Sequence, residues 1–360
     1  MVCSIRGVAR LPLAIALAVA ASLEASAQLP TVEKLTEIGC LDCTGPAQFS
    51  EIHDVAVSDS GEIVVADRSA PMLRLFDRGG RVLWTGGRSG GGPGEYRYPM
   101  RVAIGPNRSL TVVDMRARRL TRLARDGAVT STDPILAFPA AASPRGRTGD
   151  LAFLMDDFSG PFAIERWTAT SSKSAAHTTV ARTPSPVGRG MVQPSMAAAA
   201  NGALAIGIDP FTYRIVRLDP GGRPLPDITR DIPLARRSEA EMQELGARLA
   251  AGPQIRSTEQ SVSTAPASTP LRSSGTDYTM KPFHPLDGLR YDDSGRLWVL
   301  TTRGVDQQAV FDIFAPTGAF AGSVTVPVRV RTFSLAGPYL ATASEDAEGV
   351  PRVTLWRVRG

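Results

Sequence analysis

The 360-residue sequence is poor in the residues from which most catalytic and metal sites are built. It contains three histidines, three cysteines and only three lysines, Lys34, Lys173 and Lys281. Arginine therefore carries nearly all of the positive charge, and the formal net charge is a mild +5 at pH 7. The basic residues are scattered and form no cluster that alternates with aromatic residues, so we do not expect nucleic acid as a partner.

An apolar run long enough to cross a membrane as a helix, about 20 residues, is also missing. The longest early run, residues 11–21, follows two arginines and contains a single proline. It is followed by Ala25-Ser26-Ala27, the small-x-small pattern that a signal peptidase cleaves. We therefore predict that residues 1–27 are a signal peptide, that the mature protein is exported to the periplasm or the extracellular space, and that it has no stable membrane span.

Cysteine is scarce in the predicted mature chain, where only Cys40 and Cys43 remain. In an oxidising compartment this spacing favours a small local disulfide over two free thiols. A redox-active pair would usually open a helix in a βαβ setting, whereas these residues lie among predicted strands. A zinc site would need two further ligands, and none stands nearby at metal spacing.

What the sequence has in abundance is short apolar segments separated by turn residues. Residues 54–67 are two short strands joined at Asp59-Ser60-Gly61, where a tight turn needs residues that tolerate positive φ. Residues 72–76 and 82–85 add two more strands around a turn at Arg78-Gly79-Gly80. Similar units recur along the chain at residues 101–129, 151–167, 201–222, 288–324 and 332–358. The unit at residues 151–167 is degenerate.

Repeated four-stranded antiparallel units are typical of a β-propeller, in which each unit buries its apolar faces against its neighbours. The sixth copy runs out of chain after three strands, and residues 32–38 can supply the missing outer strand. We predict an all-β fold over residues 28–360: a six-bladed β-propeller of four-stranded antiparallel blades, closed by an N-terminal strand. We expect a monomer.

One segment, residues 231–283 between the fourth and fifth copies, interrupts the repeat. Residues 236–250 are predicted to be helical, with Ser238 as N-cap and Glu241 at capping-box spacing. Residues 252–277 are rich in Ser, Thr, Pro and Gly, a composition typical of a mobile loop. Such an excursion is either functional, as a flap over one face of the ring, or a tolerated surface insertion.

Three local features carry a resemblance to a known family. They are Val65-Ala66-Asp67 followed by residues 72–77, a GGGPGE loop at residues 90–95 followed by Tyr96 and Pro99, and residues 292–299 after the insertion. Together they resemble the six-bladed, NHL-like propellers of exported bacterial proteins, over essentially the whole mature chain. The resemblance implies the fold and identifies no activity.

The GGGPGE loop is the first candidate site. Successive glycines allow backbone N–H groups to converge on an anion. A phosphate-binding loop, however, has a lysine and opens a helix, and this loop has neither feature. The loop is thus predicted to be an inter-blade connection; if it binds a ligand, Arg88, Glu95 and Arg97 are the side chains able to contact it, with Tyr96 beside them.

Acidic residues recur at the ends of predicted second strands, at Asp67, Asp114 and Asp209. A catalytic residue should occur once in the ring, whereas recurrence in each copy indicates a structural role, as an acceptor of hydrogen bonds from the following turn. Arginines on the third strands are expected to reach the same acids. These arginines are Arg74, Arg122 and Arg214.

The histidines are His53, His177 and His284, and two of them, His53 and His284, precede a predicted first strand. They can therefore approach the mouth of the central tunnel, although isolated histidines are more often packing residues. Enzymes that share this fold, such as lactonases, amidating lyases and strictosidine-synthase-like proteins, typically bind a metal there. We assign no catalytic residue.

We therefore favour a binding or scaffold module whose ligand is a peptide, a glycan or an envelope protein, without a cofactor. The alternative is a metal-assisted hydrolase, lactonase or lyase that uses the tunnel. In that case calcium is the expected metal, because oxygen ligands abound in the sequence and nitrogen ligands do not.

Overall fold

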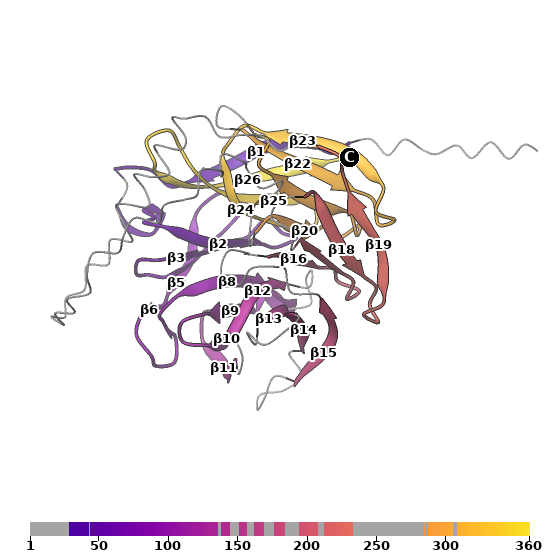
Figure 1. Cartoon of the computed structure of the whole chain (residues 1–360). Helices are drawn as coiled ribbons and strands as arrows, with labels where there is room; N and C mark the ends of the chain where they lie inside the picture. Colours follow the sequence, from indigo (N-terminus) through magenta and orange to yellow (C-terminus); the bar gives the residue numbers. More distant parts are fainter. Residues whose placement is uncertain are drawn as a thin grey trace, which may run out of the picture.

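The computed structural model of the chain is drawn in Figure 1. The structure describes residues 29–42, 44–135, 138–144, 151–156, 162–168, 176–183, 194–207, 212–232, 284, 287–304 and 308–360. The predicted signal peptide, Cys43, Asp209 and nearly all of the predicted insertion lie outside these residues. Among the described residues, no helix has the length and apolar character needed to cross a membrane.

Most described residues belong to β-strands, and the two helical segments among them are single 3-10 turns, η1 (Gly45–Ala47) and η2 (Pro106–Arg108). Within the described chain the strands form six four-stranded antiparallel sheets and one short parallel pair. The first sheet contains β2 (Ile52–Val57), β3 (Ile63–Asp67), β4 (Leu73–Phe76) and β5 (Val82–Gly86). The second contains β8 (Pro99–Ile104), β9 (Leu110–Asp114), β10 (Arg119–Leu123) and β11 (Val129–Pro134). The parallel pair between them is β6 (Arg88–Ser89) with β7 (Glu95–Tyr96).

The remaining sheets follow in chain order. The third contains β12 (Phe138–Pro144), β13 (Leu151–Asp156), β14 (Phe162–Thr168) and β15 (Ala176–Thr183). The fourth contains β16 (Ser195–Ala198), β17 (Leu204–Gly207), β18 (Arg214–Leu218) and β19 (Pro224–Thr229). The fifth contains β20 (Leu289–Tyr291), β21 (Leu297–Thr301), β22 (Ala309–Phe314) and β23 (Phe320–Val326). The sixth contains β24 (Val330–Ala336), β25 (Tyr339–Glu345), β26 (Pro351–Arg359) and β1 (Thr31–Ile38).

The hairpin turns are held by their own aspartates. In the turn between β4 and β5, Asp77 Oδ1 accepts hydrogen bonds from the backbone N–H groups of Gly79 and Arg81, both at 2.9 Å. The N–H groups of Arg81 and Gly79 lower the pKa of Asp77. Asp219 and Asp292 accept backbone N–H groups in the same way in later turns. These local bonds explain why the turns are polar and evenly spaced in the sequence.

The first strands of the sheets line the centre of the molecule (Figure 1). Strand β2 contacts β8, β8 contacts β12, β12 contacts β16, β16 contacts β20, β20 contacts β24, and β24 contacts β2 again. The inner strands are almost wholly buried, as in β3, whereas outer strands such as β5 are largely exposed or half-buried. This arrangement is that of a propeller, and it confirms the prediction of an all-β propeller fold.

The core is divided among the interfaces between sheets. Six hydrophobic clusters occur within the described residues, and each joins two neighbouring sheets. The cluster between the fifth and sixth sheets, for example, contains Trp298, Phe311 and Phe333, whose rings meet edge to face. Because each sheet is apolar on both faces, it can bury its side chains only with one neighbouring sheet on each face.

Strand β1 joins the two ends of the described chain in one sheet. It pairs antiparallel with β26 from Thr31 opposite Arg359 to Ile38 opposite Val353. Gly39 follows with a φ of +111°, and a Cβ at this position would lie 2.5 Å from the carbonyl oxygen of Pro351. The glycine thus lets the chain leave the sheet while its backbone stays close to that of β26.

We predict that Ile38→Ala lowers the free energy of unfolding by about 2–5 kcal/mol, because Ile38 is 5% exposed and belongs to the cluster between the sixth and first sheets. Val82→Ala on the exposed strand β5 is the control, with a loss below about 0.5 kcal/mol. Urea unfolding of both variants measures the difference. Equal losses would show that β1 is not packed into the core.

Candidate functional site

Two aspartates and two arginines form a buried cluster at the end of the channel where the first strands begin. Asp54 lies on β2, Arg101 on β8 and Arg290 on β20, and Asp287 directly precedes β20. Arg101 Nη1 donates a hydrogen bond to Asp54 Oδ1 at 3.1 Å and another to Asp287 Oδ1. Arg290 Nη2 donates to Asp287 Oδ1 at 3.2 Å and lies 3.9 Å from Asp54 Oδ1.

Two further donors complete the surroundings of Asp54. The backbone N–H of Val102 donates to Oδ2 at 2.9 Å, and Thr332 Oγ1 on β24 donates to Oδ1 at 3.0 Å. The cluster therefore connects the first, second, fifth and sixth sheets through one carboxylate and its partners.

The charges of this cluster sum to zero and are largely withdrawn from water. The side chains of Asp54 and Arg101 are each 1% exposed, and that of Arg290 is 9% exposed. Burial alone would lower the pKa of Arg101, but the negative charges of Asp287 and Asp54 raise it above its ordinary value. Burial, and then the positive charge of Arg101, lower the pKa of Arg290. Removing one partner of such a set leaves an uncompensated buried charge, at a cost of about 3–5 kcal/mol.

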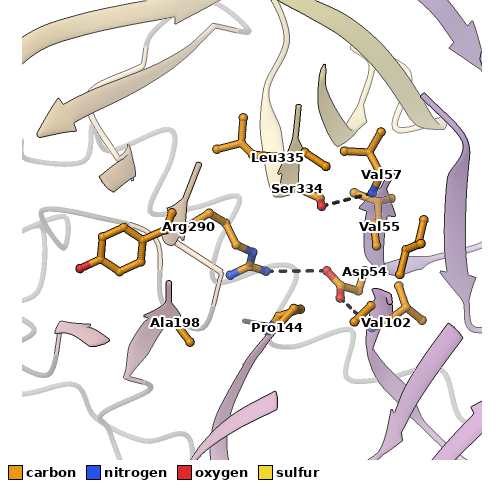
Figure 2. Close-up of a pocket in the computed structure, with 14 residues that line it drawn as sticks. Asp54, Val55, Val57, Val102, Pro144, Ala198, Arg290, Ser334 and Leu335 are labelled. Carbon is orange, nitrogen blue, oxygen red and sulfur yellow. Dashed lines mark hydrogen bonds and ion pairs between the residues drawn. The ribbon is translucent and has the colours of Figure 1, made fainter. Parts of the chain in front are cut away.

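A cavity lies beside the cluster on the channel axis (Figure 2). Its polar lining comes from Asp54, Arg290 and Ser334, and Ser334 Oγ accepts the backbone N–H of Val57 at 3.2 Å. Its other walls are mainly apolar. Its volume is about 40 Å³, room for about three water molecules. A sugar or a lactone does not fit this volume.

The two predicted tunnel histidines lie in separate packing environments. His53 Nδ1 is 3.3 Å from the carbonyl oxygen of Pro99, and its ring centre is 4.4 Å from that of Tyr98. Burial lowers the pKa of His53. His284 is held by its backbone, which donates to Leu300 O at 3.0 Å and accepts from Ser195 Oγ at 2.5 Å. Among the described residues, no hydrogen bond or ring contact brings His53 and His284 together.

The GGGPGE loop is folded around its own carboxylate. Glu95 Oε2 accepts the backbone N–H of Gly92 at 2.7 Å, and Glu95 Oε1 accepts Arg88 Nε at 2.8 Å. These donors, the Gly92 N–H first, lower the pKa of Glu95. A Cβ on Gly90 would collide with the same carboxylate. The place that a bound anion would take is therefore filled by Glu95.

The other two residues predicted beside the loop differ in exposure. Tyr96 is fully buried in the cluster between the first and second sheets, and burial raises its pKa to about 12. Arg97 is exposed, and its backbone N–H donates to Asp114 Oδ2 at 2.6 Å. Of the predicted contact residues around the loop, Arg97 and the Glu95-bound Arg88 are thus the exposed ones.

Both described recurring acids are buried acceptors for neighbouring backbone groups. Asp67 accepts the N–H groups of Ser50 and Ser69. Asp114 accepts those of Arg97, Tyr98 and Ala117. This geometry is what a structural role requires, and the prediction for Asp209 lies outside the described residues.

Among the described residues, one of the expected pairs between a third-strand arginine and a recurring acid is present. Arg74 Nη1 lies 3.2 Å from Asp67 Oδ2, as expected. Arg122 instead pairs with Asp133 at 2.5 Å, and Arg214 with Asp227 at 2.7 Å. The expectation was wrong for Arg122, because Asp133 lies on the neighbouring fourth strand, within reach across the hairpin. For Arg214 it stays a prediction, since Asp209 lies outside the described residues.

Cys40 is disulfide-bonded. Its predicted partner, Cys43, lies outside the described residues, so the pairing stays a prediction.

The channel cluster was not identified by sequence reasoning. A signal was nevertheless present: Asp54-Val55-Ala56-Val57 and Arg101-Val102-Ala103-Ile104 occupy equivalent places in successive copies and carry opposite charges. A lone charged residue at the start of an otherwise apolar inner strand needs a buried partner. The partnership with Asp287 and Arg290, more than half the chain away, has no comparable local signal.

Comparison with known proteins places the chain among β-propellers without assigning an activity. No protein-family model and no curated protein matches its sequence. A protein of unknown function from Bacteroides thetaiotaomicron is similar in structure, with a TM-score of 0.53, 9% identity and coverage of 92% of this chain and 76% of that one.

Two other solved structures are similar along nearly their whole length. A member of the DUF4221 family from Bacteroides vulgatus has a TM-score of 0.51 and 7% identity, with coverage of 92% and 99%. Virginiamycin B lyase from Staphylococcus aureus has a TM-score of 0.48 and 12% identity, with coverage of 91% and 99%. At these identities the likeness to the two Bacteroides proteins shows the fold alone.

We predict that His284 makes the protein less stable in acid. Burial, with the nearby charge of Arg329, lowers its pKa to about 4, against an ordinary value of 6.5. Between these values the unfolded chain binds a proton that the folded chain does not, so stability falls as the pH drops from 6.5 to 4, by about 3 kcal/mol in all. Urea unfolding across this range measures the slope.

The variant His284→Asn should flatten that slope, while Glu348→Gln on the exposed surface should leave it unchanged. An unaltered slope in His284→Asn would show that this imidazole does not stay neutral in the fold.

Proposed function

We propose that the protein is an exported, six-bladed, NHL-like β-propeller that serves as a binding or scaffold module for a peptide, a glycan or an envelope protein. The observation that carries the proposal is the buried cluster of Asp54, Arg101, Asp287 and Arg290. Its acids are already paired with guanidinium groups. An acid held in this way is a poor general base and a poor metal ligand. We therefore assign ligand binding to the exposed surface of the ring and not to the channel.

Several observations support the finer parts of this proposal. Six four-stranded sheets and six inter-sheet clusters within the described residues support six blades. The pairing of β1 with β26 supports closure of the ring by the N-terminal strand. The disulfide at Cys40 supports an oxidising compartment and hence export, with residues 1–27 as the signal peptide.

The ligand is proposed to meet the end of the ring where the first strands begin. Residues 97–98 lead into β8 at this end, and the connection between β9 and β10 lies there as well. These two connections carry the exposed arginines Arg97, Arg116 and Arg118. Exposed guanidinium groups suit carboxylate and phosphate recognition.

The alternative, a calcium-assisted hydrolase or lyase in the channel, is favoured by one contact. The carboxylates of Asp54 and Asp287 both bind Arg101 Nη1, so they converge on one point of the channel. A metal there would require Arg101 to move away, which would break the buried pairs.

We predict that the purified mature protein binds ligands on a peptide and glycan array, and that these arginines make the contacts. The triple variant Arg97→Ser, Arg116→Ser, Arg118→Ser should weaken that binding at least tenfold. Arg81→Ser with Arg223→Ser, exposed arginines in turns at the other end of the sheets, is the matched control. Binding that is absent, or equally weakened by both variants, contradicts the proposal.

A second measurement distinguishes the binding module from the calcium-assisted enzyme. Lactones and aryl esters are incubated with the protein in calcium chloride and in EDTA, and the melting temperature is recorded in both. A binding module should show the same melting temperature and no turnover that depends on the channel. Calcium-dependent turnover abolished by Asp287→Asn but retained in Glu348→Gln would establish the enzyme instead.

A further inference from the structure

A second cavity lies on the first sheet, between the connection from β1 to β2 and the turn from β3 to β4. Its volume is about 360 Å³, within the range of small-molecule pockets. Its walls include Pro46, Phe49 and Pro71, and Arg74 lines it from β4. Both segments lie at the end of the ring to which we assign ligand binding.

Arg74 is buried yet makes no side-chain hydrogen bond to the described residues. Its side chain is 2% exposed, and its Nε and Nη1 atoms are closed to solvent without a hydrogen-bond partner. Its charge is balanced by Asp67, 3.2 Å from Nη1, and the guanidinium lies over the ring of Phe49 at 5.1 Å. The cation is thus held in place electrostatically, while its Nε and Nη1 donors remain unused.

Arg74 makes no hydrogen bond to Asp67 because the carboxylate oxygens of Asp67 already accept four others. Ser50 donates through its backbone N–H at 3.0 Å and its hydroxyl at 2.9 Å. Ser69 donates through its backbone N–H and its hydroxyl, both at 2.8 Å. A carboxylate has about four acceptor positions, so none is left for Arg74.

The other buried arginines of the described chain differ in this respect. Arg101 and Arg290 donate to the carboxylates of the channel cluster. Arg217 donates to the carbonyl oxygens of Thr317 and Pro316, at 2.7 and 2.5 Å. Buried donors are normally satisfied, so an arginine without an acceptor at the wall of a cavity indicates that the acceptor comes from outside.

We propose that this cavity binds a small monocarboxylate, either a free acid or the C-terminal carboxylate of a peptide. The carboxylate of the ligand pairs with the Arg74 guanidinium at the wall of the cavity, as a charge-assisted contact. The body of the ligand packs against Pro46, Phe49 and Pro71. This inference rests on the proposed function, since it names a ligand class for the binding module, although the site can be tested separately.

The test is calorimetric titration of the mature protein with two probes, benzoate for a free acid and N-acetyl-alanyl-phenylalanine for a peptide C-terminus. At least one probe should bind with 1:1 stoichiometry, and the C-terminal amide of the peptide should bind at least tenfold more weakly than its acid. Arg74→Gln should weaken binding at least tenfold. Arg81→Gln, whose side chain is 81% exposed on the same sheet, should leave it unchanged.

Arg74→Gln also leaves Asp67 buried without a cation, so a second variant keeps that pair intact. Gln48→Trp fills the cavity from its wall and should abolish binding with little change in melting temperature. Binding by neither probe, equal binding of acid and amide, equally tight binding of inorganic phosphate, or full binding by Gln48→Trp would each overturn the inference. If array ligands still bind while neither probe does, the inference fails and the proposed function stands.

Discussion

The structure depends on the pairing of buried charges at the start of the channel. Asp54 can lie 1% exposed only because Arg101, Val102 and Thr332 all donate to it, and these residues belong to neighbouring sheets. A shift of one sheet would leave a buried charge without its partner, which is far more costly than the loss of one apolar contact. The cluster therefore sets the position of four sheets around the axis.

Acidic side chains outside the channel cluster also bind groups of neighbouring sheets, in addition to the apolar clusters between those sheets. Asp312 on β22 accepts Tyr213 Oη at 2.9 Å and Arg230 Nη1 at 2.6 Å, both from the fourth sheet. Glu62 accepts Arg108 and Arg125 from the second sheet. Apolar burial between the sheets supplies the driving force, and these links select which sheet faces which. We propose that the function lies outside these links, at the exposed arginines and the Arg74 cavity.

The sequence predicts the local features well and the long-range partnerships poorly. The turns held by Asp77 and Asp292 follow from residues close in the chain, and so do the strands around them. The acceptor role expected for Asp67 also depends on nearby groups. In contrast, Arg101 meets Asp287 only through the closed ring, which no local pattern encodes. The glycine pattern indicates N–H groups that can bind an anion. In the structure the Gly92 N–H donates to a carboxylate, but that carboxylate belongs to Glu95 of the same loop.

The charged cluster of the channel holds the ring together. A double-mutant cycle on Asp54→Asn and Arg101→Gln, with unfolding free energies measured in urea, tests it directly. Because the two groups share a buried hydrogen bond, we predict a coupling energy of at least about 1.5 kcal/mol, with each single variant strongly destabilised. Effects that add to within about 0.5 kcal/mol would contradict it.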